Sequence, residues 1–222
     1  MKNIKNNSNK TNNKNSTNIT NNSGSIGKNG VSVRKIAVVA IMSALAEVLM
    51  ILEFSVPFVP SFLKFDFSDL PAYITAFAFG PVSGVLVELL KNVIHLPFTA
   101  TSGVGELANF LVGASLVLPA GIIYKKKKTL SGAIIGSVCG AVFAAIVSFP
   151  VNYFITYPFY SGFMPMEAII SLYKAIIPQA DTLVKALLMI NVPFTFIKGA
   201  VNVLITFLIY KKISPVLKGQ NK

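Results

Sequence analysis

Charged side chains are scarce in this sequence. They make up 13% of its 222 residues, whereas hydrophobic residues reach 53% and the mean hydropathy is +0.65. Soluble domains carry about 25% charged residues, so the composition excludes an ordinary soluble domain. The apolar residues come in long blocks rather than amphipathic stripes, and blocks of roughly 17–25 residues are typical of helices that span a bilayer. The sequence therefore predicts an all-α integral membrane protein.

Reactive groups are equally rare. The single cysteine, Cys139, excludes an internal disulfide and is expected to be a small packed residue. The single histidine, His95, has no Cys or His cluster beside it, so we expect an interfacial histidine and no metal site. The sequence has no GxxxxGK[ST], HExxH or GxSxG motif and no obvious duplicated half. We therefore expect neither an enzyme nor a protein that hydrolyses ATP itself, and no cofactor; a binding subunit that depends on a partner fits better.

Positive charge is in excess, with a net charge of +12, and it flanks the apolar blocks. Five lysines lie in the first 30 residues, four at positions 125–128 and four after Tyr210. The positive-inside rule places such residues on the cytoplasmic side. No basic face carries the interleaved aromatic residues that bind nucleic acid, so we expect a lipid bilayer and not a nucleic acid as the partner.

The apolar blocks cover residues 36–52, 70–96, 105–124, 130–157 and 183–210. Gly80-Pro81 interrupts the second block, and a break there gives six spans with all the basic flanks on one side. We therefore predict a six-helix membrane domain over residues 34–213 with both termini in the cytoplasm. Residues 1–33 are expected to be a disordered, retained tail, and residues 214–222 a short cytoplasmic tail.

This topology places loops 53–68, 95–103 and 158–182 outside. The first loop has two prolines and five phenylalanines, among them Phe58, Phe62 and Phe65, and would be unfavourable in water. It is expected to fold back over the bundle as a lid above an external pocket.

Small residues recur at a spacing of four in two blocks. Ala40 and Ala44 could let a helix of a partner protein, or of the same chain, approach closely. For Gly132, Gly136 and Gly140 we expect packing inside the bundle.

Polar residues inside the apolar blocks are the candidate binding residues. Lys198 lies too deep to reach the cytoplasm, and Thr195 can share its inward face, which indicates a ligand or an ion-pair partner. Asn152, next to Tyr153, suits a flat aromatic ligand with polar edges, although a belt of interfacial aromatic residues explains the tyrosine equally well.

Glu106 and Asn109 lie three residues apart near the outer end of the fourth span. Glu106 either pairs with Lys91 or Lys198 for structural reasons, or forms with Asn109 a polar wall of the pocket. The residues alone leave both interpretations open.

The stretch KFDFSDLPAYITAFAFGPVSGVLVELLKNVIH, followed by TSGVGELANFLVGASLVLPAGIIY, closely resembles the riboflavin-specific S component of energy-coupling factor (ECF) vitamin transporters. The similarity extends over nearly everything after Val33. It implies a six-helix bundle with cytoplasmic termini in a prokaryotic plasma membrane. It also implies capture of riboflavin from outside, followed by delivery inward with a transmembrane coupling protein and two cytoplasmic ATPases.

The resemblance assigns roles to residues of this chain. It implies that Ala40 and Ala44 contact the coupling protein, that residues 57–67 form the lid, and that Asn152 and Lys198 bind the flavin. Thr195 stands where relatives carry an asparagine, which puts one hydrogen bond to the ligand in doubt. The alternatives are an S component for another vitamin, such as thiamine or folate, and a membrane assembly protein without transport activity.

Overall fold

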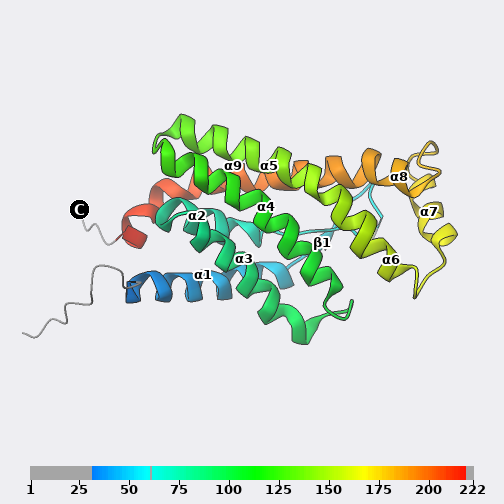
Figure 1. Ribbon diagram of the computed structural model, residues 1–222, viewed down its shortest axis with the longest axis horizontal. Coiled ribbons are helices and arrows are strands. Elements are labelled where there is room, and N and C mark those ends of the chain that lie inside the picture. Colours follow the sequence, from blue (N-terminus) through cyan, green and yellow to red (C-terminus); the bar gives the residue numbers. More distant parts are fainter. Residues whose placement is uncertain (1–31, 61, 219–222) are drawn as a thin grey trace, which may run out of the picture. The chain divides into compact units, whose positions relative to one another are not determined.

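The computed structural model describes residues 32–60 and 62–218, and their side chains as far as residue 209. Side chains of three expected segments lie outside the described residues: nearly all of the tail over residues 1–33, the lysines after Tyr210 and the C-terminal tail. The described chain is mostly helical (Figure 1). Its first half contains α1 (Val33–Ile51), β1 (Phe54–Ser55), β2 (Lys64–Phe65), α2 (Asp69–Phe79), α3 (Pro81–His95), the 3₁₀ turn η1 (Leu96–Phe98) and α4 (Val104–Lys126).

The second half contains two long helices, each interrupted by a π-helical segment. The first runs through α5 (Leu130–Val151), the π segment η2 (Asn152–Thr156) and α6 (Tyr157–Tyr160). After α7 (Met166–Lys174), the second runs through α8 (Leu183–Ala186), the π segment η3 (Leu187–Asn191) and α9 (Val192–Lys218). Three helices of the described residues are long and apolar enough to cross a membrane: Val104–Lys126, Leu130–Tyr160 and Leu183–Ile209.

The break expected at Gly80-Pro81 is confirmed. Gly80 has a φ of 96°, in the region that favours glycine, and its N–H closes α2 on the carbonyl of Ala76. Pro81 then opens α3 at its first position, where the lost N–H is not needed. The single apolar block therefore becomes two helices that pack side by side.

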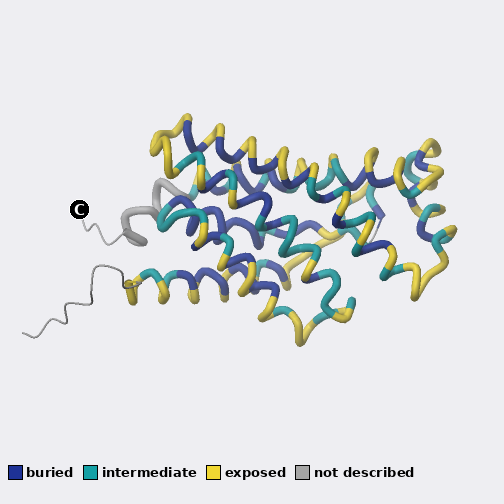
Figure 2. The backbone as a smooth tube through the Cα atoms, viewed as in Figure 1, coloured by how far each residue is buried: buried dark blue, intermediate teal, exposed yellow. Residues whose placement is uncertain are grey.

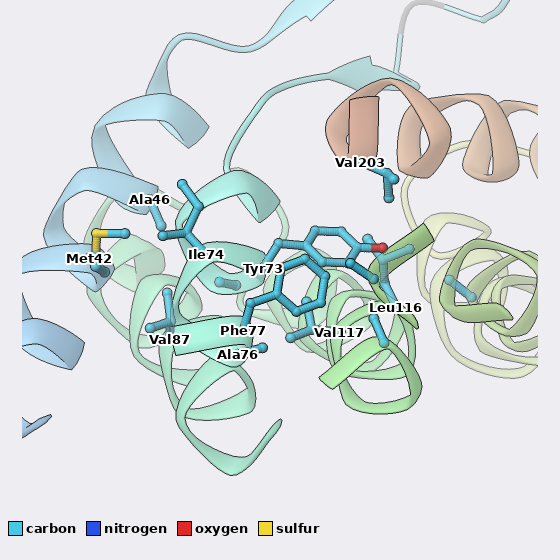
Figure 3. Close-up of a cluster of buried hydrophobic side chains, with 14 of the residues drawn as sticks. Met42, Ala46, Tyr73, Ile74, Ala76, Phe77, Val87, Leu116, Val117 and Val203 are labelled. Carbon is cyan, nitrogen blue, oxygen red and sulfur yellow. The ribbon is translucent and has the colours of Figure 1, made fainter. Parts of the chain in front are cut away.

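The core is organised around α2. Every residue from Asp69 to Phe77 is buried, and α2 contacts α1, α3, α4 and α9. Figure 2 shows the buried residues on the inner faces of the helices and the exposed residues on their outer faces. In Figure 3, Tyr73 and Phe77 of α2 lie between Val87 of α3, Val117 of α4 and Val203 of α9.

The glycines of α5 pack inside the bundle, as expected from their spacing. A Cβ on Gly140 would lie 2.2 Å from the carbonyl oxygen of Leu116, and one on Gly136 would lie 2.8 Å from that of Ala120. These contacts place α5 directly against the backbone of α4. The expectation for Cys139 is wrong: it is exposed on the outer face of α5, beside the exposed Ile135, because the glycines occupy the packed face.

The ends of the helices fall into two groups. The start of α1 and the turn between α4 and α5 lie at one end of the bundle, and α6, α7 and α8 lie at the other (Figure 1). Between α1 and α2 the apolar loop forms a two-stranded antiparallel hairpin that pairs Phe54 with Phe65 and Ser55 with Lys64.

Candidate functional site

The hairpin between α1 and α2 is called the lid hairpin below. A cavity of about 440 Å³ lies among the lid hairpin, α2, α4, η2 and α9. Pockets of this size hold drug-sized ligands. Six of the nine ligand-binding residues expected from the sequence line it: Phe62, Glu106, Asn109, Asn152, Thr195 and Lys198. These residues come from positions as far apart as 62 and 198, so the fold brings the predicted set together.

Lys198 forms an ion pair inside the cavity. Its Nζ donates to Oδ2 of Asp66 at 2.7 Å, and the two side chains are only 15% and 5% exposed. Burial alone would raise the pKa of the Asp66 carboxyl, but the nearby ammonium groups of Lys198 and Lys91 lower it to about 2. The pair therefore stays ionised and joins the lid hairpin to α9.

A second charged network lies directly behind this pair. Lys91 of α3 contacts Asp69 and Glu88, each at 2.7 Å, and also donates to Oγ of Ser68 at 2.8 Å. Asn202 of α9 donates to the other oxygen of Asp69 at 3.2 Å. Buried charges are retained only when paired, so this network ties the start of α2 to α3 and α9.

The two π segments both reach the cavity, through Asn152 of η2 and Asn191 of η3. The side chain of Asn152 donates to the carbonyl of Ser148 at 2.7 Å. Asn191 donates to the hydroxyl of Tyr157 at 3.0 Å and accepts from that of Tyr173 at 2.6 Å, and the two hydroxyls also contact each other. π segments often occur at functional sites, where they redirect side chains out of the regular helical register.

Glu106 faces the cavity, but not as a lysine partner. Its Oε2 accepts from the hydroxyls of Thr99 at 2.9 Å and Thr101 at 3.2 Å, and its Oε1 lies 3.9 Å from Nε2 of His95. The alternative that Glu106 pairs with Lys91 or Lys198 is therefore wrong, because carboxylates of the lid, α2 and α3 already hold both lysines.

His95 lies between two carboxylates. Its Nδ1 is 2.8 Å from Oε1 of Glu47 on α1, and its other nitrogen faces Glu106. Asn109, the neighbour of Glu106 on α4, donates a longer contact of 3.6 Å to the sulfur of Met50.

Three expected binding residues lie away from the cavity. Phe65 packs against Phe54 and Phe67 on the opposite face of the hairpin, Phe58 is 87% exposed, and Tyr153 stacks on Phe149. The hairpin explains the separation within the lid, because successive side chains of a strand point to opposite faces. Lys64 and Asp66 line the cavity, whereas Phe65 lines an apolar groove on the other side.

Asp66 and Asp69 are two cavity-lining residues that sequence reasoning missed. Both lie in the stretch KFDFSDLPA, residues 64–72, and both are buried. An available signal was the depth of Lys198: a buried ammonium needs a carboxylate, and these two acids lie in an otherwise apolar stretch.

The expected partner-contact residues lie on the surface of α1. Ala40 and Ala44 are both exposed, next to the exposed Ile41, whereas Met42 and Ala46 face the core. This face of α1 is therefore open for contact with another helix.

Comparison with known proteins identifies the family of the chain. Residues 34–210 match the family model described as ECF transporter, substrate-specific component. The chain belongs to this family. The family and the apolar helices make this S component a multi-pass protein of the prokaryotic plasma membrane.

Relatives of this S component include two proteins named as riboflavin transporters. RibU of Staphylococcus aureus (strain TCH60) is 36% identical over 176 residues, which cover 79% of this chain and 88% of the relative. FmnP of Bacillus subtilis (strain 168) is 32% identical over 182 residues, or 80% and 90% of the two chains. A solved S component of a bacterial ECF transporter superposes with a TM-score of 0.67 at 32% identity, covering 83% of this chain and 98% of that one.

Proposed function

We propose that this S component binds riboflavin in the cavity beneath the lid hairpin and captures it for import. The observation that carries the proposal is the 440 Å³ cavity, which brings Asn152, Thr195 and Lys198 together in a protein whose relatives are named as riboflavin transporters. Riboflavin is flat, with polar ring edges and a hydroxylated side chain. It needs both aromatic surface and buried hydrogen-bonding groups.

The cavity offers both kinds of contact. Phe62 and Phe194 supply aromatic surface, and the polar edges of the ring and the ribityl hydroxyls meet Asn152, Thr195 and Lys198. Each polar ligand group that is buried without a partner costs about 1–3 kcal/mol, so these side chains also select for the pattern of polar groups on the ligand.

The ion pair between Lys198 and Asp66 holds the lid hairpin against α9 in the closed state. Asp66 follows the second strand of the hairpin, so opening the hairpin separates it from Lys198 on α9. In the open state, water hydrates the two separated charged groups. The ligand, when bound, adds contacts to both sides of the cavity and therefore favours the closed state.

The membrane arrangement that we propose has six spans with both termini in the cytoplasm. It is supported by the position of the four lysines 125–128, which lie at the same end of the bundle as the start of α1 (Figure 1). In this orientation the cavity opens outward. The exposed Ala40 and Ala44 then contact the transmembrane coupling protein, and two partner ATPases supply the energy.

The test is binding by the full chain purified in detergent without added ligand. Riboflavin fluorescence should be quenched on titration and saturate at one equivalent, and protein that retains the vitamin should show its visible absorption band. A folded sample, judged from its circular dichroism and monodisperse elution, that shows neither quenching nor the absorption band would rule out riboflavin as the ligand. Thiamine and folate are then tested in the same assay.

A further inference from the structure

The two lysines that line the cavity each have a carboxylate neighbour. Lys198 is held by Asp66 at 2.7 Å, and Lys64 lies 3.9 Å from Glu53 in a pair whose members are each 40% exposed. Behind them Lys91 is shared between two carboxylates. Among the described side chains, no lysine or arginine lining the cavity is left without a carboxylate.

One wall of the cavity carries negative charge in excess. We call Glu47, His95 and Glu106 the acidic cluster. Both carboxyl groups are buried, with relative exposures of 5% and 6%, and the ion pairs of the described residues give neither of them a lysine or arginine partner. His95 lies between them at 2.8 Å and 3.9 Å. Two carboxyl groups therefore share one imidazole, and the cluster holds more acidic than basic groups.

Two threonines hold the carboxyl group of Glu106 in place. Thr99 and Thr101 donate hydrogen bonds to the same oxygen, Oε2, at 2.9 and 3.2 Å. The carboxyl group of Glu106 is therefore a fixed feature of this wall. Among the described residues, its Oε1 has only the imidazole of His95, at 3.9 Å, as an ionic neighbour.

We propose that Glu106 is a specificity-determining residue that makes the cavity discriminate against phosphorylated flavin, with Glu47 adding to the effect through His95. The inference rests on the proposed function. A phosphate ester carries about −1.5 to −2 charges at neutral pH. Inside the cavity it would lose water, meet the carboxylate of Glu106 and find no unpaired cation. It could recruit Lys64 or Lys198 only by breaking an existing ion pair. Riboflavin has no net charge, so the carboxylate of Glu106 does not repel it electrostatically.

The experiment compares the dissociation constants of riboflavin and riboflavin 5′-phosphate (FMN) by fluorescence quenching. The samples are the unaltered chain, Glu106→Gln and, as the matched control, Glu167→Gln. Glu167 is an exposed acid in the first turn of α7 and does not line the cavity. Glutamine at position 106 keeps an oxygen that can accept from Thr99 and Thr101, so it removes the charge and preserves the shape.

For the unaltered chain we expect FMN to bind at least ~10-fold more weakly than riboflavin, from repulsion between buried like charges. Glu106→Gln should lower the ratio of the FMN dissociation constant to the riboflavin dissociation constant by about fivefold or more. Glu167→Gln should leave the ratio unchanged. Equal affinities for the two flavins in the unaltered chain, or an unchanged ratio in Glu106→Gln, would overturn the inference and leave riboflavin binding intact.

A second variant covers the case in which Glu106→Gln does not fold. Glu47→Gln removes the other carboxylate of the acidic cluster from outside the cavity lining. It should narrow the ratio in the same direction by a smaller factor, and an unchanged ratio counts against the inference. If the unaltered chain binds neither flavin, the proposed function itself fails and this inference fails with it.

Discussion

Lys198 combines two roles that a single substitution removes together. It lines the cavity and it holds Asp66 of the lid at 2.7 Å. Removing an ammonium from a buried pair leaves its carboxylate without a partner, which costs more than the pair itself contributes. The effects on binding and on stability therefore have to be measured side by side.

Lys198→Ala should weaken riboflavin binding by about 10- to 100-fold, the equivalent of one or two buried hydrogen bonds. It should also lower the unfolding temperature, because Asp66 is then buried without a cation. Titration and a thermal melt in detergent measure the two effects.

The matched control is Lys185→Ala, which removes an equally short Lys–Asp pair of 2.7 Å whose members are 54% and 45% exposed. Exposed pairs contribute little, so the control should change neither quantity. Unchanged affinity in Lys198→Ala would remove this residue from the binding site.

Lys91 pairs with carboxylates inside the bundle and does not line the cavity. It is fully buried and neutralises part of the charge on Asp69 and Glu88, each at 2.7 Å. Lys91→Met should destabilise the fold by about 3–5 kcal/mol, because two carboxylates would remain inside the bundle without their cation. Denaturant unfolding in detergent tests this, again against Lys185→Met. Stability close to that of the unaltered protein would mean that the carboxylates are neutralised in another way.

For two contacts of the cavity, the sequence located one partner but not the other. The depth of Lys198 marks it as a buried cation, but Asp66 lies 132 positions earlier, in a loop whose fold is not visible in its hydropathy. For Glu106 the reverse holds. Its position on the pocket wall could be expected, whereas its true partners, Thr99 and Thr101, lie in a short connection that sequence patterns do not place.

At the scale of elements, the contact between α4 and α5 depends on the absence of side chains. The carbonyl oxygen of Leu116 lies 2.2 Å from where a Cβ of residue 140 would be. Backbone atoms cannot move aside as the end of a flexible side chain can. Two helices that approach so closely gain dispersion contacts, which are the main source of helix association in lipid.

Gly140→Ala should therefore destabilise the bundle by about 1–3 kcal/mol, as overpacking typically does. Its neighbour provides the control: Cys139→Ala changes an exposed residue of the same helix and should alter stability by less than about 0.5 kcal/mol. Thermal melts of both variants give the comparison. A Gly140→Ala variant as stable as Cys139→Ala would show that α5 is free to shift away from α4.

Hydropathy predicts the break at Gly80-Pro81 but not the two π segments. A helix break is visible in the composition, because glycine and proline stand out in an apolar run. A π segment only shifts the register within a continuous apolar helix, as at Asn152–Thr156 and Leu187–Asn191, and leaves the composition unchanged. The lid shows the same limit. Its apolar character predicts that it covers the bundle, whereas the hairpin decides that Phe62 faces the cavity and Phe65 does not.

At the scale of the whole molecule, the cavity and the exposed alanines of α1 occupy different surfaces. The cavity lies among the lid, α2, α4, η2 and α9, whereas Ala40 and Ala44 are exposed on α1 and do not line it. If α1 docks on a coupling protein as proposed, larger side chains there should block transport without changing the affinity for the ligand. This separation distinguishes a transport subunit from a protein that only stores the vitamin.

Ala40→Leu combined with Ala44→Leu should leave riboflavin binding within about twofold of the unaltered chain, since neither position touches the cavity, and should abolish riboflavin uptake by cells that contain the ECF module. Cys139→Leu is the matched control, because it enlarges a small exposed residue on α5. It should preserve both binding and uptake.

Uptake is measured with labelled vitamin, and co-purification with the coupling protein shows whether the complex still forms. If the α1 variant transports normally, the partner contacts another face of the bundle. If Cys139→Leu also blocks uptake, the outer face of α5 belongs to the docking surface as well, and the contact involves more of the bundle than α1.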